Sequence, residues 1–162
     1  MKVNWNAEIQ NLQEKARRLL HLGEKDGYVY ADELTLLNRE VDSLIQLLWN
    51  LKLRTSEEEG TLCVALLMGF NGCMYANPAN EKKRKTVVDR ALRLIDKLEP
   101  SFLKCQLLVY CYGEIYEEDL AQEAHNIMQD WNDRPLSPEE TELKETLHIF
   151  EENPYPHWEI AG

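Results

Sequence analysis

Apolar side chains return every three or four residues through most of the sequence, and this spacing constrains the fold more than any other feature. It places the apolar residues on one face of an α-helix, whereas a half-buried β-strand would alternate apolar and polar residues. The first such face consists of Trp5, Ile9, Leu12, Ala16 and Leu19. The spacing therefore predicts an all-α protein.

Capping residues and helix breakers divide the sequence into seven expected helices. Ser56 to Glu59 and Ser137 to Glu140 each match a capping box, in which a serine and a glutamate satisfy each other's free backbone donors. Asp32 and Ser101 are the expected caps of two other helices. The expected helices cover about residues 5–23, 32–48, 56–70, 80–98, 102–112, 120–131 and 138–150.

Two of these helices have no polar face. Leu62–Phe70 is apolar without a break, which predicts a helix buried on nearly all sides. Leu107–Tyr112 is rich in residues that favour strands, but a lone strand would leave its backbone donors unpaired. We therefore expect the third and fifth helices to lie at the centre of the fold.

The length predicts a single domain over residues 1–162, with an extended tail from about residue 153 because two prolines follow closely. A weak internal repeat supports a helix-hairpin or short solenoid-like bundle. Leu66-Leu67 precedes Gly72-x-x-Tyr75 by the interval at which Leu107-Leu108 precedes Gly113-x-x-Tyr116. Each copy is followed by an amphipathic helix, as in stacked helical repeats.

Acidic residues are concentrated in the last third of the chain. Residues 1–112 carry 15 acidic and 16 basic residues, whereas residues 113–162 carry 14 acidic residues and only Arg134 and Lys144 as bases. Such a block either serves solubility alone or steers the approach of a basic protein surface. The acidity argues against direct nucleic-acid binding, which needs a basic face.

The remaining composition indicates a soluble, cytoplasmic protein. No long apolar run could span a membrane, and residues 1–10 lack the apolar core of a signal peptide. The spacing of Cys63, Cys73, Cys105 and Cys111 matches no zinc-binding pattern, so we expect four buried thiols and no disulfide.

The sequence contains no catalytic motif that would indicate an enzyme. Glu145-x-x-His148 occurs once, whereas a di-iron bundle needs the motif twice, so we interpret it as a pair on a helix surface. The basic run Lys82–Lys85 is expected to be a solvated helix start. We predict no catalytic residue, no metal and no cofactor.

Aromatic and acidic residues lie together after residue 111, in a composition suited to binding an arginine-rich surface. The alternative is that the aromatic side chains belong to the core and the acids form a hydrated face. The candidate partner-binding residues are Tyr112, Glu114, Tyr116, Glu117, Glu118, Asp119 and Trp131.

Several longer segments resemble the UpxZ family of transcription anti-terminator antagonists, and the resemblance extends from about Leu12 to Pro156. The segments that carry it are Ser56–Gly69, Leu103–Leu108, Tyr110–Glu114, Leu120–His125 and Glu151–Pro156. The resemblance implies an inhibitor of NusG-like anti-terminators of the UpxY type, which promote read-through of capsular polysaccharide operons.

It therefore implies a protein partner, and possible contact with the transcription elongation complex, without direct binding to nucleic acid or membrane. The resemblance supplies no partner-contact residues. A helical-repeat adaptor for a basic protein or peptide stays open as an alternative, and a metal-dependent enzyme is a third.

Overall fold

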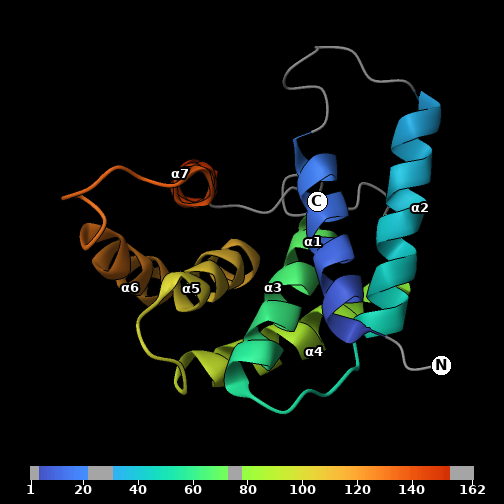
Figure 1. Ribbon diagram of the computed structural model, residues 1–162, viewed down its shortest axis with the longest axis horizontal. Helices are drawn as coiled ribbons and strands as arrows, with labels where there is room; N and C mark the ends of the chain where they lie inside the picture. Colours follow the sequence, from blue (N-terminus) through green and yellow to red (C-terminus); the bar gives the residue numbers. More distant parts are fainter. Residues whose placement is uncertain (1–3, 22–30, 73–77, 154–162) are drawn as a thin grey trace. The chain divides into compact units, whose positions relative to one another are not determined.

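The computed structural model describes residues 4–21, 31–72 and 78–153. These residues form seven α-helices and no strand, so the predicted all-α fold is confirmed. The helices are α1 (Trp5–Leu20), α2 (Ala31–Leu48), α3 (Ser56–Gly72), α4 (Pro78–Ile95), α5 (Phe102–Ile115), α6 (Glu118–Gln129) and α7 (Pro138–Glu152) (Figure 1). They fall into two compact units, Met1–Arg90 and Ala91–Gly162.

The first unit is organised around α3. Its residues Leu62–Phe70 are all buried, as their unbroken apolar sequence predicted, and α1 and α2 pack on α3 and on each other (Figure 1). Gly69 permits the close approach, because a Cβ atom there would lie 3.1 Å from the Ile45 side chain and 3.3 Å from Leu12. The expected central position of the third helix is confirmed within this unit.

Side chains of α4 bind backbone carbonyls and polar groups of this first unit. Arg90 is buried and donates to the carbonyl oxygens of Trp49 (3.1 Å) and Leu51 (2.7 Å), and it also pairs with the carboxylate of Glu59. Arg84 donates to the Phe70 carbonyl at 3.1 Å. These bonds satisfy acceptors that burial would otherwise leave without water.

The cap of α3 differs from the sequence prediction by one residue. The hydroxyl of Thr55, not Ser56, accepts the backbone N–H of Glu58 at 3.1 Å and also donates to the Glu58 carboxylate. Glu59 is therefore free of the capping role and binds Arg90. Both positions fit the pattern of a hydroxyl followed three residues later by glutamate, so local sequence could not choose between them.

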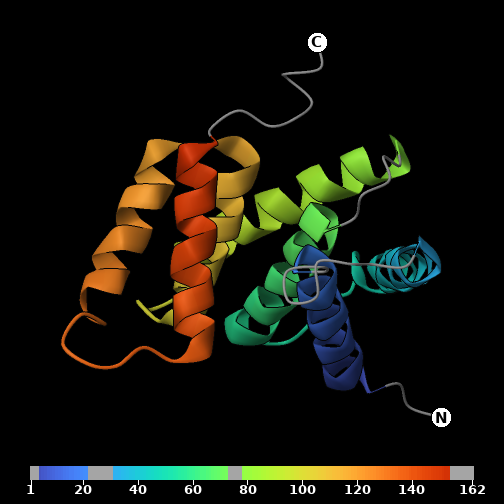
Figure 2. The same ribbon diagram turned by 90° about the horizontal axis from the view of Figure 1, so that it is seen from above.

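The second unit is organised around α5, on which α6 and α7 both pack (Figure 2). Ser101 caps α5 by accepting the N–H of Lys104, as expected, and Leu107–Tyr112 is helical. At Gly113 a Cβ atom would lie 2.6 Å from the Phe150 ring, so glycine lets α7 lie close against α5. The ring of Tyr110 meets Phe150 edge-on at 6.4 Å.

Several helix ends differ from the expected positions. The second helix begins at Ala31, before the expected cap Asp32. The fourth covers Pro78–Ile95 rather than 80–98, and the fifth continues to Ile115. The sixth ends at Gln129, which places Trp131 in the connection to α7. At the start of α7 the predicted capping box of Ser137 and Glu140 is confirmed, with Pro138 in the first turn.

The cysteines that the structure describes, Cys63, Cys105 and Cys111, are buried as expected. Burial raises the pKa of the Cys105 thiol to about 12. Cys73 and the tail beyond residue 153 lie outside the described residues. The single domain and the solenoid-like stacking stay predictions. No described helix is both long and apolar enough to cross a membrane.

Candidate protein-binding site

The turn from α5 to α6, residues 114–119, brings together most of the candidate partner-binding residues; we call it the α5–α6 corner. Tyr116 ends α5 in the left-handed conformation, with φ 55° and ψ 37°, and its N–H donates to the Tyr112 carbonyl at 2.8 Å. It is the only non-glycine residue with positive φ in the described part of the chain. Glycine normally takes this position, since a side chain there costs about 1–2 kcal/mol.

A contact of the Tyr116 ring helps to hold the strained backbone of this residue. The ring lies edge-on against the ring of Tyr112, with 5.3 Å between the centroids. Burial, and secondarily the negative charge of Glu114, raises the pKa of Tyr116, so the phenol stays neutral at physiological pH. A neutral, half-exposed tyrosine fixed by its neighbour offers a partner a rigid contact at little entropic cost.

The acidic residues of the corner are open to solvent. Glu117, Glu118 and Asp119 are exposed, whereas Glu114 is half-buried. Glu118 and Asp119 occupy the first turn of α6, where a carboxylate is favoured by the helix dipole. Ile115 is 37% exposed between them and Glu114, which adds an apolar contact that the sequence analysis did not identify.

The structure separates the two remaining aromatic candidates from this surface. Tyr112 is 3% exposed and Trp131 is 6% exposed, so both lie in the core of their unit. Trp131 packs on Phe102, with ring centroids 6.0 Å apart, and follows the end of α6 about 18 Å from its first turn. A partner would therefore meet Tyr116, Ile115 and the acids, while the role of all seven candidates stays a prediction.

A groove of about 620 Å³ lies between α6 and α7, and the sequence analysis did not anticipate it. Met128 and Leu147, both buried, form its floor, and Ile149 lines it while 56% exposed. We call it the α6–α7 groove. The exposed isoleucine was the available signal, because it falls outside the buried face of Leu143 and Leu147 on the same helix.

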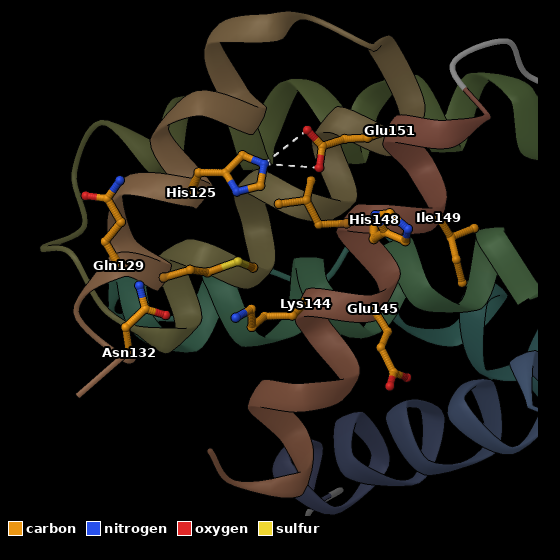
Figure 3. Close-up of a pocket in the computed structure, with 10 residues that line it drawn as sticks. His125, Gln129, Asn132, Lys144, Glu145, His148, Ile149 and Glu151 are labelled. Carbon is orange, nitrogen blue, oxygen red and sulfur yellow. Dashed lines mark hydrogen bonds and ion pairs between the residues drawn. The ribbon is translucent and has the colours of Figure 1, made fainter. Parts of the chain in front are cut away.

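Polar side chains line the walls of the groove. Figure 3 shows His125 from α6 reaching Glu151 of α7, with its Nε2 atom 3.0 Å from both carboxylate oxygens. Gln129 and Asn132 stand on the α6 side, and Lys144 extends from α7 (Figure 3). Burial, and then the negative charges of Glu118 and Glu151, raises the pKa of Tyr112.

Polar side chains outside the corner and the groove walls also have local partners. His148 pairs with Glu152 at 3.0 Å, and both side chains are exposed. No group of three or more metal-ligating side chains occurs among the described residues. Within the basic run Lys82–Lys85, Lys83 binds Gln46 and lies 5.6 Å from the Trp49 ring, whereas Lys82 and Lys85 are exposed.

Comparisons with known proteins agree on one family. The family model of the UpxZ transcription anti-terminator antagonists matches residues 9–113. The crystal structure of a transcription anti-terminator antagonist UpxZ from Bacteroides uniformis ATCC 8492 is 39% identical in sequence, with a TM-score of 0.84. That similarity covers 93% of this chain and 94% of the other. No curated protein sequence matches the chain.

Proposed function

Because the chain belongs to the UpxZ family of transcription anti-terminator antagonists, we propose that it inhibits a NusG-like anti-terminator of the UpxY type by binding it directly. In this way it regulates the expression of capsular polysaccharide operons in the cytoplasm. The mechanism needs no catalytic group, metal or cofactor, and no contact with nucleic acid.

The exposed acids of the α5–α6 corner are the observation that carries this proposal. Glu117, Glu118 and Asp119 follow Ile115 and Tyr116 directly in the chain, so exposed carboxylates lie next to a small aromatic and apolar centre. This is the arrangement of an interface with a desolvated centre and a charged rim. A NusG-like protein contacts polymerase and nucleic acid, for which a basic surface is suited, and an acidic corner would compete for that surface.

The direct test is to reverse these charges and to measure binding. A variant with E117K, E118K and D119K should associate with a purified UpxY-type protein at least about tenfold more slowly, because rim charges govern mainly the association rate. It should also relieve inhibition of read-through in a transcription assay. The salt dependence of association should weaken, since fewer opposite charges remain to be screened.

A matched control reverses three exposed acids outside the corner, D89K, D96K and E99K. This control changes the net charge by the same amount as the corner variant. Its association should slow much less than that of the corner variant if the position of the charges matters. A second control, K82E with K85E, leaves the structural contacts of Lys83 intact. Lysines in the first turn of α6 oppose the helix dipole by about 0.3–1 kcal/mol each, so melting curves must accompany the binding data. Equal inhibition by the corner variant and the parent would refute the proposal.

A further inference from the structure

The α6–α7 groove has the geometry of an unfilled position in a helix bundle. Helices α6 and α7 both pack on α5, and Figure 2 shows them running antiparallel in front of it. Between them the groove keeps a floor of Met128 and Leu147 and leaves Ile149 exposed. The residues that line it span 125–132 on one side and 144–151 on the other, about 10 Å in each case, which corresponds to about two turns of a facing helix.

A helix fits this groove better than an extended peptide. The walls are helices, whose backbone groups bond internally, so they offer an extended chain no ladder of donors and acceptors. A bound helix satisfies its own backbone and needs only an apolar face towards the floor. A helix laid against two others buries residues at i, i+3, i+4 and i+7.

The charge of the walls indicates which helix would bind. Helix α6 carries three acidic residues and α7 carries six, with Lys144 as the single basic residue of the two helices. An acidic amphipathic helix would be repelled by these carboxylates, and a neutral one would gain little electrostatic attraction. Among the residues that line the groove, Glu145 and Glu151 of α7 are acidic and Lys144 is basic, so lysines or arginines on the flank that faces α7 would lie close to carboxylates.

We propose that the α6–α7 groove binds a basic amphipathic α-helix of the protein partner. The identity of that partner as the anti-terminator rests on the proposed function above. The α5–α6 corner then steers the approach of the partner, and the groove holds the docked helix.

The first experiment tests the groove without the anti-terminator. The probe is a peptide of about 14 residues, half of them leucines on one helical face (i, i+3, i+4, i+7 and onward) and half of them lysines on the other. Its control has the same residues in strict alternation, which favours a strand. Calorimetry with the full chain should show binding of the first peptide at least about tenfold tighter than the second. Equal binding of the two would mean that charge alone attracts them, and the helix proposal would fail.

Two substitutions on α6 localise the binding. Gln129 lines the groove and Gln122 does not, and both side chains are exposed. Gln129→Trp should fill the groove and weaken peptide binding at least about tenfold, whereas Gln122→Trp should change it less than about twofold. Ile149→Ala should weaken it severalfold. If the two tryptophan variants bind the peptide alike, the groove is not the site.

The same two variants, mixed with the UpxY-type protein, separate this proposal from the proposed function. If the parent binds that protein and Gln129→Trp binds it equally well, the function stands and the groove proposal fails. If the parent does not bind it while the peptide results hold, the proposed function fails and the groove remains a helix-binding site. If the protein dimerises with increasing concentration and Gln129→Trp abolishes this, a second copy is the occupant and the proposal is overturned. The proposal is also overturned if small organic compounds saturate the groove while the peptide does not bind.

Discussion

Glu140 is a residue whose protonation the fold controls. Arg134 donates to both of its carboxylate oxygens, at 2.8 and 2.5 Å, and the Ser137 backbone N–H donates to Oε1 at 2.9 Å. The Arg134 side chain, then the Ser137 N–H, lowers the pKa of Glu140 to about 2. These bonds fasten residues 134–137 to the first turn of α7.

The low pKa predicts how Glu140→Gln alters stability with pH. Because the folded-state pKa lies below the unfolded value, the carboxylate stabilises the fold above about pH 5, and the contribution is lost as pH falls towards about 2. Urea unfolding should show the variant less stable than the parent by a constant difference near neutral pH. That difference should shrink steadily in acid.

The adjacent Glu139 is exposed and supplies the control. Glu139→Gln should follow the parent closely at every pH, because it removes a charge without removing the bonds of Glu140. A difference between Glu140→Gln and the parent that stayed the same from neutral pH down to about pH 3 would mean that the pKa of Glu140 is not depressed.

Leucine-to-alanine substitutions should destabilise the protein more in the central helices α3 and α5 than at exposed positions. Leu66 and Leu108 are fully buried, so Leu66→Ala and Leu108→Ala should each cost about 2–5 kcal/mol of unfolding free energy through the cavity they leave. Leu36 and Leu47 of α2 are 58% and 51% exposed. The same substitution there should cost less than about 0.5 kcal/mol.

Chemical denaturation measures all four variants under one condition. If Leu66→Ala or Leu108→Ala left the unfolding midpoint where the exposed-leucine variants leave it, that helix would not form the centre of its unit. The comparison removes the intrinsic difference between leucine and alanine, because all four positions are helical and the substitution is identical.

The elements show what sequence patterns can and cannot predict. The helices follow from apolar periodicity and capping residues, and the burial of α3 and α5 follows from their apolar runs; each segment contains these signals in itself. The cap of α3 was misplaced by one residue because Thr55 and Ser56 both have glutamate three positions later, and only the contact of Glu59 with Arg90 distinguishes them. Long-range contacts of this kind leave no local signal.

In the candidate site, too, local features could be predicted from the sequence and long-range ones could not. The acids and Tyr116 were predictable because they are adjacent in sequence, and a turn between two helices keeps them together. Tyr112 and Trp131 were also proposed as contacts, yet they are buried, since aromatic residues serve cores and interfaces alike. The α6–α7 groove was missed because it depends on how far apart two helices lie on α5, which neither helix encodes alone.

At the scale of the whole molecule, the net charge is −11, and all of the negative excess falls after residue 112. On the second unit, Lys104 pairs with Glu123 and Arg134 pairs with Glu140, while His125 and His148 contact the carboxylates of Glu151 and Glu152. The second unit has far more carboxylates than such pairs can use. Its surface is therefore self-repelling in the absence of a partner, and a basic partner would relieve that repulsion.

This imbalance predicts that moderate salt stabilises the isolated protein. Raising ionic strength from about 0.01 M to about 0.15 M shortens the Debye length from about 30 Å to about 8 Å, which screens repulsion among exposed acids. Exposed ion pairs contribute only about 0–1 kcal/mol each, so the loss of their attraction is smaller. The melting temperature should rise by about 2–4 °C, equivalent to about 1 kcal/mol at this chain length.

Neutralising exposed acids beyond residue 112 should reduce this gain, and the test variant carries D133N, E139Q and E145Q. Its matched control carries D89N, D96N and E99Q, which remove the same charge from a segment that also contains bases. Calorimetric melting over a salt series should give the test variant a smaller rise than the parent, and the control a rise equal to or larger than that of the parent. A melting temperature that falls with salt in the parent would show that attraction dominates on this surface. The acidic block would then be internally compensated, and it would have no repulsion for a basic partner to relieve.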